Sequence, residues 1–351
     1  MTEPAPTTSP ATDRPEERVR VAVLGSGAWG TTFAAVMADA GCDVTLWARR
    51  EDVASDVREN HRNEAYLAGV ELPAGVTATT DAAEAVRGAR IVAVAVPSQH
   101  ARTGLAPFAA LLEPDAVVVS LMKGVELGTD RRMSEVLSEV LDVPAERVAV
   151  VSGPNLAKEI AAQQPTGTVV SCPDEANARL VAAACTTPYF RPYTNTDVVG
   201  VELCGAAKNV IALVVGIAQG RGYGYNTMAT VITRGLVEIT RLGLALGAQV
   251  ETFAGLAGMG DLVATCASPL SRNHTLGKYV GGGMSLDEAV RATGGTAEGV
   301  KSCVSILELA GRHDVEMPIT GAAVAMIHDG RSVDDVTRAL LGRPQKAESL
   351  S

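Results

Sequence analysis

The feature that most constrains this chain is a glycine-rich turn between a predicted strand and a predicted helix. Residues 19–24 form a short apolar run typical of a buried strand, and the motif GSGAWG follows at residues 25–30. An alanine-rich stretch over residues 31–40 predicts a helix, and residues 44–47 predict the next strand. This order is typical of the opening βαβ unit of a doubly wound sheet that binds a dinucleotide.

Each of the three glycines has a physical role in such a turn. Gly25 allows the tight turn, Gly27 lets the backbone approach a pyrophosphate, and Gly30 lets the helix pack on the strand. The helix N-terminus then presents unpaired N–H groups and the positive end of its dipole to the phosphates. A plain strand-to-helix turn is the alternative, but the flanking strand and helix favour dinucleotide binding.

The residues after the second predicted strand favour NADP(H) over NAD(H). An NAD-dependent enzyme usually carries an acidic residue there, which binds the ribose 2′-hydroxyl. This chain instead has Arg49 and Arg50, with Glu51 only afterwards. Two guanidinium groups suit a 2′-phosphate. We therefore predict NADP(H) as the preferred cofactor and do not exclude NAD(H); the alternative is a pair of solvated surface arginines.

The rest of the chain shows two patterns of predicted secondary structure, alternating strands and helices followed by helices. Apolar runs typical of strands buried in a parallel sheet occur at residues 91–96, 116–121 and 148–151, with weaker ones at 168–171 and 190–193. Predicted helices alternate with them at residues 81–87, 105–112 and 133–141. Beyond residue 196, predicted helices dominate, at residues 198–219, 228–246, 302–310 and 322–327, with loops at 255–261, 268–274 and 281–285.

These patterns predict an α/β fold with two domains. Residues 19–195 would form a Rossmann-type doubly wound parallel sheet that binds the dinucleotide, and residues 196–343 an all-helical substrate domain. Residues 1–18, rich in proline, threonine and acidic groups, predict a disordered tail, and residues 344–351 a flexible C-terminus.

Lys208 lies inside the longest predicted helix, in the stretch ELCGAAKNVIAL. At helical spacing it shares a face with Cys204, Ile211 and Val215, which are apolar. A lysine on an apolar face is unfavourable without a partner, and this position is too far from a helix end for the side chain to reach solvent. Burial lowers the pKa of a lysine and fits it for acid–base catalysis near neutral pH. We therefore predict that Lys208 is catalytic rather than structural.

Polar residues suited to a phosphorylated substrate occur at three further places. Asp261 follows a glycine-rich stretch, and residues 271–273 (Ser-Arg-Asn) are good phosphate ligands. Lys123 follows one predicted strand, and residues 152–155 (Ser-Gly-Pro-Asn) follow another. Because open α/β sheets bind ligands at the carboxyl ends of their strands, we expect these groups to border one crevice. Each group alone could equally be a surface charge or a loop turn.

Composition excludes several classes of function. The chain has 30 Lys and Arg against 40 Asp and Glu, a formal net charge of −10, which argues against non-specific binding to nucleic acid or an anionic membrane. Its apolar runs are shorter than the roughly 18–20 residues that span a bilayer, and its N-terminus lacks an apolar signal segment, so we expect a cytoplasmic protein without a membrane span. Six dispersed cysteines without a CxxC pair, and five scattered histidines, predict neither a disulfide framework nor a metal site.

Together, these segments resemble the NAD(P)-dependent glycerol-3-phosphate dehydrogenases of the bacterial cytosolic type. The similarity runs from about residue 19 to residue 343 and rests on GSGAWGTT, SLMKGVE, SGPNLAKEI, ELCGAAKNVIAL, GLAGMGDLVATC, SRNHTLG and EMPIT, in the family's order. The resemblance implies reversible reduction of dihydroxyacetone phosphate to sn-glycerol 3-phosphate, a precursor of phospholipids. It further implies that Lys208 is the catalytic acid/base and that the enzyme is a homodimer.

The resemblance also implies contacts for individual residues. Those with the substrate are Lys123, Gly153, Lys208, Asp261, Ser271, Arg272 and Asn273, to which we add Asn155, where the family usually carries Thr or Ser. Those with the cofactor are Ala28, Trp29, Arg49, Lys123, Ala157, Arg272, Thr296 and Glu298, to which the charge argument adds Arg50. Thr296 replaces a common Val.

A reaction scheme follows from these assignments. The Lys208 ammonium would stabilise the substrate's carbonyl oxygen and give it a proton, with Asp261 orienting the lysine. Residues 271–273 would bind the substrate phosphate and so position the ketone. The alternatives are a related hydroxyacid or 6-phosphogluconate-type dehydrogenase and a non-catalytic NADPH-binding redox sensor. A methyltransferase is disfavoured by Arg49 and Arg50.

Overall fold

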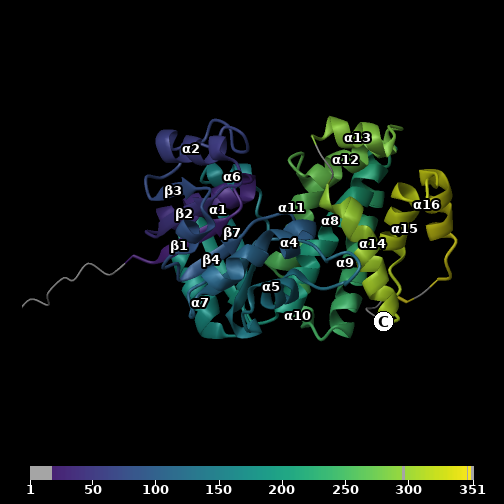
Figure 1. Ribbon diagram of the computed structural model, residues 1–351. Coiled ribbons are helices and arrows are strands. Elements are labelled where there is room, and N and C mark those ends of the chain that lie inside the picture. The colour runs from purple at the N-terminus through teal and green to yellow at the C-terminus, as the bar shows by residue number, and fades with distance from the viewer. Residues whose placement is uncertain (1–17, 295–296, 346, 349–351) are drawn as a thin grey trace, which may run out of the picture.

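The computed structural model describes residues 18–294, 297–345 and 347–348. Figure 1 shows two parts side by side, a sheet flanked by helices and a group of helices that continues the chain to its C-terminus. Residues 1–17 of the predicted tail lie outside the described residues, as does Thr296 among the predicted cofactor contacts.

An eight-stranded sheet forms the core of the first part, in the order β3-β2-β1-β4-β5-β6-β7-β8. The strands are β1 (Arg20–Leu24), β2 (Asp43–Trp47), β3 (Val76–Thr79), β4 (Ile91–Val94), β5 (Val117–Ser120), β6 (Val148–Ser152), β7 (Thr166–Ser171) and β8 (Phe190–Asn195). From β3 to β6 all neighbours are parallel. The strand order reverses between β1 and β4, which confirms the predicted doubly wound topology and puts a ligand crevice at the carboxyl ends of these strands.

The last two strands depart from the predicted parallel sheet. β7 runs antiparallel to β6, with Val170 opposite Val151, and β8 is parallel to β7. Only the five-residue helix α6 (Ala157–Ala161) lies between β6 and β7. A helix this short advances about 8 Å, too little to return the chain to the start of β6, so the chain pairs on its way back.

Helices cover both faces of the sheet. They are α1 (Ala28–Asp39), α2 (Glu51–Asn60), α3 (Ala82–Val86), α4 (Ala101–Leu105), α5 (Met133–Leu141), α6 and α7 (Glu175–Ala184), with the 3₁₀ segments η1 (Ser98–His100), η2 (Ala106–Leu111) and η3 (Ala145–Arg147). The helix predicted over residues 105–112 is mostly the 3₁₀ segment η2. Pro107 has no N–H and interrupts α-helical bonding there.

The described residues beyond β8 form helices and no strands. The helices are α8 (Val198–Gly220), α9 (Tyr225–Ala245), α10 (Val250–Ala254), η4 (Leu256–Gly260), α11 (Asp261–Ala267), α12 (Arg272–Gly281), α13 (Leu286–Ala292), α14 (Glu298–Arg312), α15 (Pro318–Ile327) and α16 (Val333–Leu341). One predicted loop is therefore wrong, and a second is a loop only over residues 268–271. Residues 255–261 form the π-helical turn η4 and the start of α11, and residues 268–274 include the start of α12.

The central helix of this part is α8. Within the described part of the chain it is the single helix long and apolar enough to cross a membrane. However, 94% of its most apolar stretch is buried inside the protein. Its neighbours include α9, α11, α12 and α14, so it is the core helix around which the others pack. An apolar surface on every side of a helix is the pattern of such a buried helix.

Helix α12 packs unusually close to α8, backbone against backbone. A Cβ at Gly216 would collide with the His274 carbonyl oxygen, and one at Gly277 with the carbonyl oxygen of Leu213. Only glycine allows helices to approach so closely. The packing fixes the N-terminus of α12, and with it residues 271–273, beside the middle of α8, where Lys208 lies.

Candidate active site

The glycine turn between β1 and α1 has the geometry of a dinucleotide site. Gly25 has φ of +121°, and a Cβ there would lie 2.6 Å from the Ala95 carbonyl oxygen. Gly30 packs against the Gly25 carbonyl, where a Cβ would collide. At Gly27, by contrast, a Cβ would meet no described atom within 4 Å. The backbone at Gly27 is therefore open to the approach of a ligand such as a pyrophosphate.

The N-terminus of α1 has further features of a cofactor site. Gly27 is its N-cap, no described side chain caps it, and its positive end is therefore available to an anion. The indole nitrogen of Trp29 is buried and has no hydrogen-bond partner among the described residues. Such orphaned donors are rare and fit a group that a ligand satisfies. Thr32 Oγ1 donates to the Ala157 carbonyl at 3.3 Å, which brings Ala157 beside α1.

Arg49 and Arg50 both lie exposed just beyond β2, at the edge where the sheet binds ligands. They are not equivalent. Arg50 is the N-cap of α2, and its guanidinium pairs with Asp52, the Nε–Oδ1 distance being 2.9 Å. The side chain of Arg49 has neither an ion pair nor a hydrogen bond to any described residue. Only one of the two predicted 2′-phosphate ligands is thus free.

A compact charge cluster surrounds Lys208. Its Nζ lies 2.5 Å from Oδ1 of Asp261 and 2.6 Å from Oγ1 of Thr265. The other carboxylate oxygen of Asp261 is 2.6 Å from Nζ of Lys123, which also donates to the Gly153 carbonyl at 3.1 Å. Lys208 is 7% exposed and Asp261 1%. One buried carboxylate therefore bridges two ammonium groups, and the cluster keeps a net positive charge that suits an anionic substrate.

The environment of Lys208 tunes its protonation. Burial lowers the pKa of Lys208 to about 8, Asp261 opposes this shift, and Lys123 adds to it. Desolvation disfavours the charged amine, while the carboxylate at contact distance favours it. A lysine whose pKa lies near 8 exchanges its proton close to neutral pH, which is the property that acid–base catalysis needs.

The ends of β5 and β6 meet at this cluster, as the sequence predicts. Lys123 follows β5, Gly153 follows β6, and the hydrogen bond between them joins the two strand ends. Both amide atoms of Asn155, Nδ2 and Oδ1, are buried without a partner among the described residues, and so is Oγ of Ser152. Buried polar atoms are normally paired, so these groups mark a place suited to a polar ligand.

The N-terminus of α12 supplies the neighbouring wall. Ser271 is its N-cap and accepts a hydrogen bond from the backbone N–H of His274 at 3.3 Å. The Asn273 amide is largely engaged: Nδ2 donates to Oδ1 of Asn209 at 3.0 Å, and Oδ1 accepts from the Gly299 backbone at 2.8 Å. Asn273 thus ties α12 to α8 and α14 and leaves one amide hydrogen for a ligand.

Glu298, the first residue of α14, closes this group. Asn209 Nδ2 donates to its carboxylate at 3.4 Å. Burial raises the pKa of Glu298, and Arg272, Lys123 and Lys208 oppose the shift in that order. Three predicted contacts from different elements therefore act electrostatically on one carboxylate, which places them around one region of the protein.

Two residues of the cluster escaped prediction. Thr265 follows Asp261 by four residues, and this helical spacing could have identified it had α11 been recognised as a helix. Asn209 adjoins Lys208, but nothing in its sequence context distinguishes its role. Within the described ranges, no three His, Cys, Asp or Glu side chains are placed to hold a metal ion.

Comparisons with known proteins agree with this geometry. Residues 20–178 match the family model of the N-terminus of NAD-dependent glycerol-3-phosphate dehydrogenase, and residues 197–338 match that of its C-terminus. The glycerol-3-phosphate dehydrogenase (NAD(P)+) of Streptomyces griseus is 60% identical over 330 residues, which are 94% of this chain and 98% of that one. The crystal structure of glycerol-3-phosphate dehydrogenase from Coxiella burnetii superposes with a TM-score of 0.87 at 34% identity, over 93% of this chain and 99% of that one.

The hydroxyacid dehydrogenases are more distant. The structure of D-mandelate dehydrogenase with NADH is 13% identical, with a TM-score of 0.56 over 89% of this chain and 98% of that one, a likeness of fold alone. The two matching family models together cover most of the chain, from β1 to α16. The chain belongs to the family of NAD-dependent glycerol-3-phosphate dehydrogenases.

Proposed function

We propose that the chain reduces dihydroxyacetone phosphate reversibly to sn-glycerol 3-phosphate with NAD(P)H, and that Lys208 exchanges the proton with the substrate oxygen. The observation that carries the proposal is the buried contact of Lys208 with Asp261, 2.5 Å, at the carboxyl edge of the sheet. A ketone oxygen gains negative charge as it becomes an alkoxide. A fixed ammonium group stabilises that charge and can then neutralise it by giving up a proton.

Hydrogen bonding leaves Lys208 one proton to give. An ammonium group has three N–H donors. One points to Asp261 and a second to Thr265, whose own hydroxyl lies 3.3 Å from the same carboxylate oxygen. The third is available to the substrate oxygen. Asp261 is therefore an orienting group that holds the ammonium in one direction, and Thr265 supports it.

The phosphate of the substrate would bind at the start of α12. The Ser271 hydroxyl, the first-turn N–H groups and the Arg272 guanidinium are donors suited to phosphate, and the helix dipole favours an anion there. Lys123 adds positive charge, and the unpaired amide of Asn155 offers a further donor. Binding energy at the phosphate would position the reacting ketone against Lys208.

The cofactor would lie along the carboxyl edge of the sheet. The residues that would hold it are Gly25, Gly27, Ala28, Trp29, Gly30, Arg49, Arg50, Lys123, Ala157, Arg272 and Glu298. When bound, its dihydronicotinamide supplies the hydride. Arg49 supports a preference for NADP(H), with NAD(H) also accepted, because its free guanidinium suits the 2′-phosphate.

The proposed organisation of the protein follows. Residues 19–195 would bind the dinucleotide and residues 196–343 would carry the substrate site, a division supported by the two family-model matches. A cytoplasmic location is supported by six cysteines that are all buried and free, as is usual in a reducing compartment. A homodimer is the commonest assembly of soluble enzymes, and light scattering of the purified protein would test it.

A substrate comparison tests the proposed activity. NADPH oxidation would be followed with dihydroxyacetone phosphate and, in parallel, with 2-keto acids, and the reverse reaction with 6-phosphogluconate. We expect turnover with dihydroxyacetone phosphate alone. Turnover with an acid instead would show a different dehydrogenase, and NADPH binding without any turnover would show a sensor; either result contradicts the proposal.

A further inference from the structure

We propose that Asp52 sets how strongly this protein distinguishes NADPH from NADH, by holding the Arg50 guanidinium in an ion pair. The proposal rests on the proposed function, in which the residues after β2 meet the 2′-phosphate. It assigns Asp52 as a specificity-determining residue. Arg49 then becomes the principal ligand of the 2′-phosphate, and Arg50 a partly neutralised neighbour.

The geometry of the pair is that of a fork against a carboxylate. Nε of Arg50 donates to Oδ1 of Asp52 at 2.9 Å, and its Nη2 contacts the other carboxylate oxygen. The side chains of both residues are more than half exposed, 51% and 62%. Arg49, one residue earlier, has neither an ion pair nor a hydrogen bond of its side chain to any described residue. Adjacent arginines at one strand end thus have different states of pairing.

The pair has a local cause and does not depend on a cofactor. Arg50 is the N-cap of α2, and Asp52 lies in its first turn, where the helix dipole favours a carboxylate. Only one residue separates the partners, so they meet wherever α2 begins. The other acidic residue of this turn, Glu51, is engaged elsewhere, with Arg58 at 3.0 Å and Thr80 at 3.1 Å.

The consequence falls on NADPH alone. The edge of the guanidinium that Asp52 occupies, Nε with Nη2, is one that binds a phosphate in the same forked manner. A 2′-phosphate must therefore displace the Asp52 carboxylate or lie beside it, and both are unfavourable. A 2′-hydroxyl makes no such demand. The pair therefore lowers the affinity for NADPH and leaves the affinity for NADH unchanged. The protein then distinguishes less strongly between the two cofactors.

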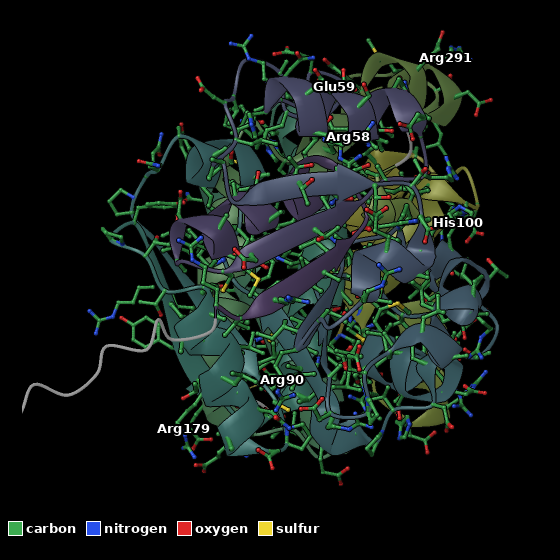
Figure 2. The ribbon with its side chains drawn as sticks, turned by 60° about the vertical axis from the view of Figure 1, so that its left-hand side comes forward. Arg58, Glu59, Arg90, His100, Arg179 and Arg291 are labelled. Carbon is green, nitrogen blue, oxygen red and sulfur yellow. The ribbon has the colours of Figure 1, made fainter. Side chains whose placement is uncertain are left out.

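Removing the carboxylate tests this role. In Asp52→Ser, the ratio of kcat/KM for NADPH to that for NADH should rise about three- to tenfold, with the NADH value within about twofold of wild type. The ratio compares two cofactors on one protein sample, so a loss of folded protein cancels from it. The control is Glu59→Gln, which removes one negative charge from the far end of the same helix (Figure 2) and should leave the ratio unchanged.

A binding measurement without catalysis separates the possible failures. Calorimetry would compare adenosine 2′,5′-bisphosphate with AMP. Asp52→Ser should tighten the bisphosphate alone, and Arg50→Ala should weaken it more in the Asp52→Ser background than in wild type. An unchanged ratio and unchanged bisphosphate affinity in Asp52→Ser, while Arg49→Ala still weakens the bisphosphate, would overturn the role of Asp52. No effect of Arg49→Ala, Arg50→Ala or both would instead remove the 2′-phosphate site on which the proposal rests.

Discussion

The glycine turn and the charge cluster of this protein, its two proposed binding regions, are encoded in the sequence in opposite ways. The glycine turn lies within six consecutive residues, 25–30, between one strand and one helix, so local sequence alone shows it. The charge cluster joins Lys123 to Asp261, 138 residues apart, and Lys208 to Asp261, 53 residues apart. A site built from one turn is legible as a motif, whereas a site built by packing is visible only when the fold brings its parts together.

The largest expected effect is on catalysis at the charge cluster, with cofactor binding at the glycine turn left intact. Lys208→Met removes the proposed proton donor and keeps the bulk of the side chain, so kcat for ketone reduction should fall about a thousandfold. NADPH affinity should stay within about twofold of wild type, because the glycine turn lies in the sheet part of the protein and Lys208 lies in α8. Stopped-flow turnover and fluorescence titration with NADPH measure the two quantities. A variant that retained a tenth of wild-type kcat would show that Lys208 is not the proton donor.

The next effect tests whether the close packing of α12 on α8 holds the helical part together. A Cβ in Gly277→Ala would collide with the Leu213 carbonyl of α8, so the free energy of unfolding should fall by about 2–4 kcal/mol. The matched control is Gly311→Ala in α14, where a Cβ would meet no described atom within 4 Å and should stabilise by about 0.5–1 kcal/mol. Urea unfolding of both variants measures this. Equal stabilities would show that the close approach of α8 and α12 is not needed.

A smaller effect is expected at the proposed cofactor site. Arg49→Ala removes the free guanidinium at the end of β2, so KM for NADPH should rise about tenfold while KM for NADH changes less than about twofold. Initial rates at saturating ketone measure both constants. Equal increases for the two cofactors would show that Arg49 stabilises the adenosine end in general rather than reading the 2′-phosphate.

The sequence predicted most of the sheet but not the change of strand direction between β6 and β7. Runs such as Ile91–Val94 and Val117–Ser120 are buried on both faces, so their composition alone indicates central parallel strands. The antiparallel β7 and the parallel β8 follow from the shortness of α6, a length that hydrophobic pattern does not fix. The strand β3 was not predicted, because its sequence VTAT is short and partly polar.

The candidate site was likewise predicted only in part. Lys208, Asp261 and Lys123 stand out because charged groups in apolar or strand-end contexts are unusual, and the structure brings them together. Thr265 was missed because the glycine-rich stretch before α11 resembles a loop, although it forms the π-helical turn η4. Such turns are frequent at functional sites, and here the turn directly precedes Asp261.

The pH dependence of kcat/KM for reduction tests the central claim most directly, because it reports the pKa of Lys208 in the free enzyme. Reduction needs the ammonium form, so kcat/KM should fall as pH rises through about 8, while oxidation of glycerol phosphate needs the neutral amine and should fall below that pH. Asp261 raises the pKa of Lys208 and Lys123 lowers it, so Asp261→Asn should move the limb to lower pH and Lys123→Met to higher pH. Limbs that shift in these opposite directions are the predicted result; a limb that stays in place in both variants would contradict the assignment of Lys208 as the titrating acid.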